Sequence, residues 1–184
     1  MDKSSLRKYI KLKKQALTAA EMQKESEIVF STINNLVCFQ AAKSILLYYS
    51  LPDELPTHRV VQQWCENKLV YLPRVNGNEL EVAPFGELVA EKVYGIEEPV
   101  APGVDPSLID LVIVPAIALD MNGNRLGRGK GYYDRFLPKC VNAYKIGVGF
   151  DCQIVDALPT EMFDIPLDAV VSASKTFIIN SFNR

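Results

Sequence analysis

The segment NRLGRGKGYYDRF, residues 124–136, combines residue types that bind phosphate groups. Three glycines alternate with two cationic residues in the order Gly127, Arg128, Gly129, Lys130, Gly131. Glycines allow unusual backbone angles and expose N–H groups, and the two cations add positive charge. A helix expected to begin near residue 131 would add the positive end of its dipole. These features suit a polyphosphate, although the spacing alone is equally compatible with a solvated turn.

The spacing differs from the common phosphate-binding motifs. In a Walker A loop, G-x-x-x-x-G-K-[ST], a glycine stands five residues before the second glycine, but Asn124 occupies that position relative to Gly129. Lys130 is followed by a glycine, whereas that motif requires a hydroxyl side chain for magnesium. A dinucleotide-binding loop would need G-x-G-x-x-G, and this segment has G-x-G-x-G. The segment therefore has the composition of a phosphate-binding loop but matches neither of these two motifs.

Hydrophobic patterns divide the chain into alternating strands and helices. Five apolar runs are typical of buried strands: residues 44–50, 69–72, 110–116, 145–150 and 169–173. Helices are expected over residues 3–17, after the capping-box spacing of Thr18 and Glu21, and from near Thr57. This alternation predicts an α/β fold with a mainly parallel sheet, in which ligands bind at the carboxyl ends of the strands.

Two segments interrupt this pattern. Asn76-Gly77 predicts a β-hairpin, and therefore one antiparallel excursion from the parallel sheet. Residues 97–106 contain three prolines and one glycine, which predicts a loop. Neither segment has the character of a linker between domains, so we expect a single domain over residues 1–184.

Composition limits the classes of partner. Twenty basic and 22 acidic residues give a net charge of −2, so no overall positive field favours nucleic acid. No apolar run approaches the about 20 residues that span a bilayer, and the basic N-terminus has no signal-peptide pattern. We expect a cytoplasmic monomer that binds small molecules and neither nucleic acid nor membranes.

The cysteines and the histidine argue against two other kinds of site. Cys38, Cys65, Cys140 and Cys152 are scattered without a C-x-x-C pair, which favours reduced thiols over a disulfide framework. The single histidine, His58, makes a multi-histidine metal site or a Cys/His zinc cluster improbable. His58 stands at an expected helix start and is interpreted as a surface or capping residue.

The complete segment NRLGRGKGYYDRF closely resembles the nucleotide-binding motif of the 5-formyltetrahydrofolate cyclo-ligase family. The resemblance extends over almost the whole chain through KSSLRK, YYSLPDELPT, YLPRV, VYGIEEP, DLVIVPAIALDMNGNRLGRGKGYYDRFL and DALPTEMFDIPLDAVVS. It implies a three-layer α/β/α fold similar to ribose-5-phosphate isomerase and CoA-transferase-like domains. It also implies ATP- and magnesium-dependent conversion of 5-formyltetrahydrofolate into 5,10-methenyltetrahydrofolate, with release of ADP and phosphate.

The implied chemistry requires no enzyme nucleophile. The formyl oxygen is a poor leaving group, so ATP phosphorylates it first, and N10 of the folate then attacks the activated carbon and expels phosphate. The protein must align the formyl oxygen with the γ-phosphate and stabilise charge during transfer. Backbone amides, lysine, arginine and a metal ion suit that task.

The resemblance also assigns site residues. ATP contacts are expected from Lys3, Arg7, Arg125, Leu126, Gly127, Arg128, Gly129, Lys130, Gly131, Tyr132 and Tyr133, with Lys130 and Arg128 as the catalytic residues. Folate contacts are expected from Arg7, Tyr49, Glu54, Tyr94, Arg128 and Tyr132. The Glu54 carboxylate would accept hydrogen bonds from the pterin, and Arg74 would face phosphate or folate unless it is an exposed hairpin residue. Without the resemblance, Lys3, Arg7, Lys11 and Lys14 would be interpreted as a solvated basic face.

The resemblance makes Asp134 and Asp168 the magnesium-associated carboxylates, provided that their loops meet at the sheet edge. Two positions depart from the family pattern: Leu119, where many members have an aromatic residue, and Phe163, where many have a histidine. Because Phe163 replaces a polar side chain, we assign no catalytic role to Asp164.

Two other functional classes are compatible with parts of the sequence. A phosphate-sugar or CoA-ester enzyme of the same architecture would bind an anionic substrate without hydrolysing ATP. A non-catalytic nucleotide- or RNA-binding module would use the basic first helix and the glycine-rich segment. The acidic net charge argues against RNA, and the segment around Glu54 argues against a general anion binder.

Overall fold

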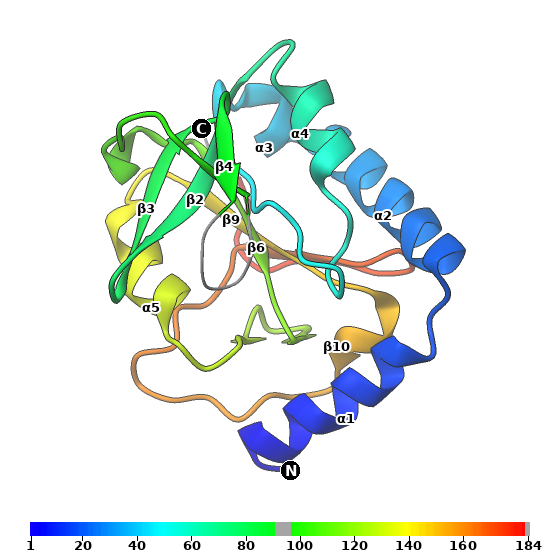
Figure 1. Ribbon diagram of the computed structural model, residues 1–184. Coiled ribbons are helices and arrows are strands. Elements are labelled where there is room, and N and C mark those ends of the chain that lie inside the picture. The colour runs from blue at the N-terminus through cyan, green and yellow to red at the C-terminus, as the bar shows by residue number, and fades with distance from the viewer. Residues whose placement is uncertain (91–96, 183–184) are drawn as a thin grey trace.

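A seven-stranded sheet forms the centre of the structure, a computed structural model that describes residues 1–90 and 97–182 (Figure 1). Its strands are β1 (Ser44–Leu46), β2 (Leu69–Asn76), β3 (Glu79–Pro84), β6 (Leu111–Pro115), β9 (Tyr144–Val148), β11 (Ala169–Val171) and β12 (Thr176–Ile178), in the spatial order β12-β11-β9-β6-β1-β2-β3. The five inner strands are parallel, and both edge strands are antiparallel to their neighbours. The predicted, mainly parallel α/β sheet is confirmed.

Helices pack on both faces of this sheet. They are α1 (Lys3–Gln15), α2 (Ala19–Asn34), α3 (Val37–Ala41), α4 (His58–Trp64) and α5 (Tyr132–Phe136), with 3-10 turns η1 (Pro106–Leu108), η2 (Leu137–Lys139) and η3 (Asp151–Gln153). Alternate strand residues point to opposite faces, so Ile45 lies in a core with α2, α3 and α4, whereas Leu46 lies in a core with Phe136 of α5. This arrangement is the predicted three-layer α/β/α fold.

The first helix packs on a second, smaller sheet. This sheet consists of β10 (Ile154–Val155), β7 (Ala118–Asp120) and β8 (Arg125–Leu126), in that order. Leu6 and Ile10 of α1 are buried against Ala118 and Leu126. Figure 1 shows β10 next to α1, at the end of the molecule towards which β6 runs. The small sheet therefore brings the glycine-rich segment, which follows β8, to α1.

Capping residues determine where the first two helices begin. Asp2 accepts hydrogen bonds from the N–H groups of Ser4 and Ser5, both at 2.9 Å, so α1 begins at Lys3. The predicted capping box of α2 is complete: the Glu21 N–H donates to Thr18 Oγ1 at 3.2 Å, and the Thr18 N–H donates to Glu21 Oε2 at 2.8 Å. These local signals place Lys3 in the first turn of α1.

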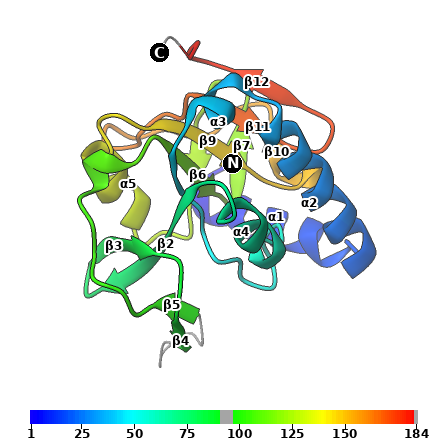
Figure 2. The same cartoon turned by 90° about the horizontal axis from the view of Figure 1, so that it is seen from above.

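The hairpin prediction is confirmed, and one loop prediction is partly wrong. Gly77, with φ +59°, lies in the turn between β2 and β3. Within the expected loop 97–106, however, β5 (Glu97–Pro99) pairs with β4 (Leu88–Ala90). Figure 2 shows this two-stranded ribbon at the edge of the molecule, beyond β2 and β3. Pairing with β4 satisfies the backbone of a segment whose prolines indicated a loop.

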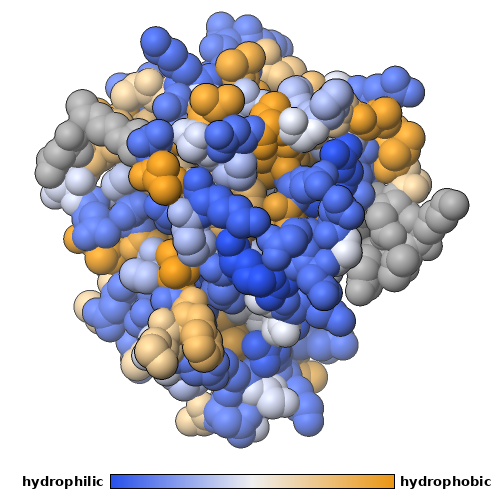
Figure 3. Space-filling model, turned by 90° about the vertical axis from the view of Figure 1, so that its left-hand side faces the viewer, coloured by the Kyte–Doolittle hydropathy of each residue, from blue (hydrophilic) through white to orange (hydrophobic). Residues whose placement is uncertain are grey.

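In the part of the chain that the structure describes, no helix combines the length and the hydrophobicity needed to cross a membrane. The face on which α5 and β3 lie is shown in Figure 3, where hydrophilic residues predominate and hydrophobic residues form small separate patches.

Candidate active site

The glycine-rich loop, residues 127–131, is held against α1. Arg7 Nε donates a hydrogen bond of 2.9 Å to the carbonyl oxygen of Gly127. Gly129 and Gly131 have φ angles of +93° and +67°, a region that other residues rarely adopt. Helix α5 follows the loop but has only 5 residues. The predicted helix start near residue 131 is confirmed, and a contribution of the helix dipole to phosphate binding stays a prediction.

Arg128 joins this loop to the segment between β1 and α4. Its Nη2 atom lies 2.6 Å from Asp53 Oδ1 and 3.0 Å from Glu54 Oε1. The second oxygen of Glu54 accepts the Leu51 N–H at 3.0 Å. Burial would raise the pKa of Asp53, but hydrogen bonds from Lys14 and Arg128 lower it below its ordinary value. The residue expected to bind phosphate thus contacts the residue expected to bind the pterin.

Lys130 lies in the same loop with its ammonium group unengaged. The residue is exposed, and within residues 1–90 and 97–182 its side chain forms no hydrogen bond or ion pair. Only its main-chain carbonyl is used, as an acceptor from Arg135 at 3.0 Å. A flexible, solvated ammonium next to a row of glycines is free to contact an anionic ligand.

A second cluster of charges surrounds Arg125. The Arg125 guanidinium lies 2.5 Å from Asp134 Oδ1, and Lys3 Nζ lies 2.9 Å from Asp164 Oδ2. Burial lowers the pKa of Arg125. The negative charge of Asp164 opposes this effect. Burial would raise the pKa of Asp164, but the hydrogen bond from Lys3 lowers it. Lys3 Nζ also lies 3.3 Å from Glu161 Oε1, so the cluster contains three carboxylates and two cations.

The structure does not bring Asp134 and Asp168 together. Asp168 accepts hydrogen bonds from the Lys145 N–H and from Asn180 Nδ2, both at 2.8 Å, at the amino ends of β9 and β11. The glycine-rich loop starts beside α1 and the small sheet, and Asp134 of α5 forms an ion pair with Arg125 of β8 in that sheet. The expectation that both loops meet at one sheet edge is therefore wrong, and the carboxylate that shares a cluster with Asp134 is Asp164.

The expected aromatic contacts have different surroundings. Burial and the nearby charge of Glu54 raise the pKa of Tyr133, while Arg125 acts in the opposite direction. Tyr132 points to the hairpin, where its hydroxyl is 3.4 Å from the Gly77 carbonyl oxygen. Tyr49 packs edge-on against the exposed ring of His58 at 4.1 Å. Tyr94 lies outside the described residues.

The side chains of Arg74, Leu126 and Leu119 make contacts that stabilise the fold. Arg74 binds Glu81 at 2.9 Å and the carbonyl oxygens of Pro99 and Ala101, so it secures the β2–β3 hairpin and the segment after β5. The Leu126 side chain is buried in the small core under α1, which leaves only its backbone for a ligand. Leu119, the first departure from the family pattern, is fully buried in the core on the α5 face, where an aromatic ring would need more room.

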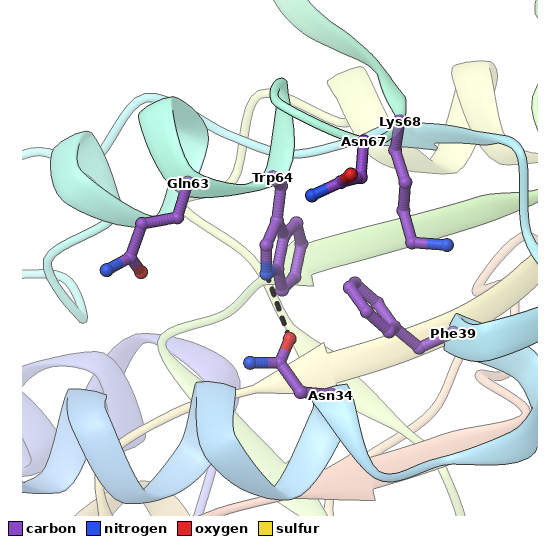
Figure 4. A pocket seen from close by; sticks show the side chains of 6 residues that line it. All are labelled: Asn34, Phe39, Gln63, Trp64, Asn67 and Lys68. Atoms are coloured by element: carbon purple, nitrogen blue, oxygen red, sulfur yellow. Dashed lines mark hydrogen bonds between the residues drawn. The ribbon is translucent and has the colours of Figure 1, made fainter.

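An open pocket elsewhere contains none of the expected site residues. It has a volume of about 410 Å³ and is lined by Asn34, Phe39, Gln63, Trp64, Asn67 and Lys68. Figure 4 shows Trp64 of α4 pointing towards α2, where its indole N–H donates to Asn34 Oδ1 at 2.9 Å. These residues shape a structural contact between helices and include no acid.

Sequence reasoning missed Asp164 and Asp53. Asp164 was set aside because of its neighbour Phe163, yet the Phe163 side chain is exposed and does not separate Asp164 from Lys3. Asp53 directly precedes Glu54, and adjacent acids in a loop after a strand were a usable signal. Together these residues give two adjoining regions, one around Arg125 and one around Arg128, that could hold two charged substrates side by side.

Comparison with known proteins agrees with this geometry. Residues 1–173 match the model of the 5-formyltetrahydrofolate cyclo-ligase family. The chain is 35% identical to 5-formyltetrahydrofolate cyclo-ligase of Escherichia coli strain K12 over 181 residues, covering 91% of this chain and 98% of the relative. It is 34% identical to the Haemophilus influenzae protein of that name over 162 residues, covering 82% and 87%.

Solved structures give the same result. The 5,10-methenyltetrahydrofolate synthetase of Aquifex aeolicus superimposes with a TM-score of 0.89 at 33% identity, covering 100% of this chain and 96% of that one. The synthetase of Mycoplasma pneumoniae superimposes with a TM-score of 0.76 at 26% identity, covering 94% and 99%. With this fold, this glycine-rich loop and these matches, the chain belongs to the 5-formyltetrahydrofolate cyclo-ligase family and converts 5-formyltetrahydrofolate into 5,10-methenyltetrahydrofolate.

Proposed function

We propose that the protein performs this ring closure with ATP and magnesium. The formyl oxygen of the folate attacks the γ-phosphorus of ATP, the bond to ADP breaks, and a phosphorylated formyl group results. The N10 lone pair then attacks the formyl carbon, the carbon–oxygen bond breaks with phosphate leaving, and N10 loses its proton. Every atom of the product comes from the two substrates, so the protein needs only to align them and stabilise charge.

The observation that supports this proposal best is the contact of Arg128 with Glu54, 3.0 Å between Nη2 and Oε1. Arg128 belongs to the loop expected to bind phosphate, and Glu54 belongs to the segment expected to bind the pterin. Phosphoryl transfer requires the donor and the acceptor atoms to be adjacent and in line. One hydrogen bond between the two segments gives that proximity.

The proposed roles follow from these positions. Lys130 and Arg128 neutralise charge on the transferring phosphoryl group, and the amides of residues 127–131 bind its oxygens. Lys3, Arg7 and Arg125 hold the remaining phosphates at the first turns of α1, while Leu126 contributes its backbone. Glu54 accepts hydrogen bonds from the pterin. Arg7, Tyr49, Tyr94 and Tyr132 remain proposed folate contacts, and Tyr133 a proposed nucleotide contact.

We place the proposed magnesium ion beside Asp134 and Asp164, where nucleotide phosphates would complete its coordination. Magnesium usually takes one or two carboxylates together with phosphate and water oxygens. Asp134 and Asp164 provide two carboxylates, and among the described residues no group of three or more His, Cys, Asp or Glu side chains could hold a metal alone. Arg125 Nε is buried without a hydrogen-bond partner in the described structure, which leaves a donor for an added anion. Bound there, magnesium would neutralise phosphate charge during transfer.

A coupled assay tests the proposed function. Purified protein, ATP, magnesium and 5-formyltetrahydrofolate should give methenyltetrahydrofolate absorbance and ADP at equal rates. Omission of either substrate should abolish both products. ADP release without the methenyl product would contradict the proposal.

The Glu54→Gln variant should lose folate use more than ATP use. The amide presents a donor where the pterin already offers N–H donors, so the KM for 5-formyltetrahydrofolate should rise by about 10-fold, as expected for one mismatched charged hydrogen bond. The KM for ATP should change by less than about 3-fold. Steady-state kinetics with each substrate varied in turn measure both constants. An equal loss for the two substrates would show that Glu54 has a structural role instead.

We also propose a cytoplasmic location and a monomeric state. All four cysteines are free, and Cys38 and Cys140 are buried, as expected for a protein kept under reducing conditions. Cell fractionation would test the location. Light scattering, which measures the mass of the particle in solution, would test the monomeric state.

A further inference from the structure

Lys14 is a buried cation at the last turn of α1. Its side chain is 4% exposed, and its Nζ atom donates to both the carboxylate and the main-chain carbonyl of Asp53, each at 2.6 Å. A lysine is rarely buried unless it is paired, and breaking such a pair is costly. The sequence pattern had placed Lys14 on a solvated basic face, and the structure contradicts that interpretation.

Asp53 has two partners on opposite sides. Its Oδ2 atom accepts from Lys14, and its Oδ1 atom accepts from Arg128 Nη2 at 2.6 Å. Arg128 uses its Nε and Nη2 atoms for Asp53 and Glu54. No hydrogen bond within the described residues uses its Nη1 atom, so the Nη1 edge of the guanidinium keeps donors for a phosphate.

The same helix also fixes the start of the glycine-rich loop. Arg7 and Lys14 are seven residues apart and therefore on one face of α1. Arg7 binds the Gly127 carbonyl, directly before Arg128, and Lys14 binds Asp53, directly before Glu54. One helical face thus holds the backbone next to Arg128 and the carboxylate that fixes its guanidinium.

We propose that Lys14 and Asp53 are positioning residues for the ring closure: Lys14 holds Asp53, and Asp53 holds the Arg128 guanidinium between the nucleotide and the folate. This inference rests on the proposed function of Arg128. Lys14 touches neither substrate in this arrangement. Its effect reaches the reaction only through Asp53 and Arg128.

Four variants separate positioning from structural support: Lys14→Met, Asp53→Ala, the double variant of both, and Arg128→Ala. Misplacing a catalytic group by about 1 Å can cost on the order of 100-fold, so Lys14→Met and Asp53→Ala should each lower kcat by about 10- to 100-fold. Replacing both members of a buried pair is often neutral for stability. Asp53→Ala leaves the buried Lys14 charge without its carboxylate, so the double variant should regain the thermal stability that Asp53→Ala loses, but its kcat should stay low.

The decisive measurement is whether the losses of kcat caused by Lys14→Met and Arg128→Ala add together. In an Arg128→Ala background, Lys14→Met should lower kcat no further, because the group that it positions is gone. Lys11→Met, an exposed lysine on the same helix, is the matched control and should retain the parent kcat.

Three results would overturn the inference. They are a double variant whose kcat recovers together with its stability, additive losses in the Arg128→Ala background, or normal turnover in both single variants. If Asp53→Ala does not fold, Lys14→Met alone decides, since it leaves the Asp53 side chain 46% exposed and still paired with Arg128. Failure of the unmodified protein to form the methenyl product would instead contradict the proposed function.

Discussion

Lys130→Ala should lower kcat by about 100- to 1000-fold, the effect of removing one preorganised group that stabilises transition-state charge. The ammonium group has no partner within the described structure, so the charge is available to the transferring phosphoryl group. For the same reason the free energy of unfolding should change by less than about 0.5 kcal/mol. Stopped-flow or steady-state turnover, together with a thermal melt, measures the two quantities.

Lys24→Ala is the matched control for this prediction. Lys24 is likewise an exposed lysine, but it lies on α2, away from the glycine-rich loop. Its replacement should leave both turnover and melting temperature unchanged. If Lys130→Ala behaved like the control, Lys130 would be an ordinary surface residue, and Arg128 with the loop amides would have to stabilise the phosphoryl group.

Asp164→Asn should raise the magnesium concentration needed for half-maximal activity by about 10- to 100-fold, the usual range for disturbing a metal's carboxylate environment. Asp164 pairs with Lys3, and its charge acts on Arg125, the partner of Asp134. Its ion pair with Lys3 is partly exposed, so its loss should cost no more than about 1 kcal/mol of stability. A magnesium titration of initial rates measures the shift.

Asp168→Asn should lower stability but leave the magnesium dependence of activity unchanged. Its two hydrogen bonds hold Lys145 and Asn180, so the amide should lower stability by about 1–2 kcal/mol without altering magnesium dependence. A shift in magnesium dependence for Asp168→Asn, with none for Asp164→Asn, would restore the pairing that the sequence suggested and refute the cluster around Arg125.

Sequence patterns identified the features of this protein that local interactions determine. The capping box of Thr18 and Glu21 marks the start of α2 because both hydrogen bonds form within four residues. The turn at Gly77 follows from a backbone angle that glycine adopts readily. The buried strands were visible as apolar runs because both faces of a parallel sheet are covered.

Features that depend on distant contacts were not visible in the sequence. Whether Asp134 meets Asp164 or Asp168 depends on which end of β11 each loop approaches, and sequence separation does not reveal that. Lys14 matched a solvated basic face by spacing, and only the fold places Asp53 beside it. Three further short elements, α3, β4 and β5, have too few residues for a period to be recognised.

The account depends most on the transfer of a phosphoryl group from ATP to the formyl oxygen. A single-turnover reaction with 5-formyltetrahydrofolate carrying ¹⁸O in its formyl group tests this step directly. The released phosphate should contain the label, because the formyl oxygen leaves bonded to phosphorus. If the label appeared in water while unlabelled phosphate was released, ATP hydrolysis and ring closure would be separate events, and the proposed alignment of the two substrates by Arg128 would be contradicted.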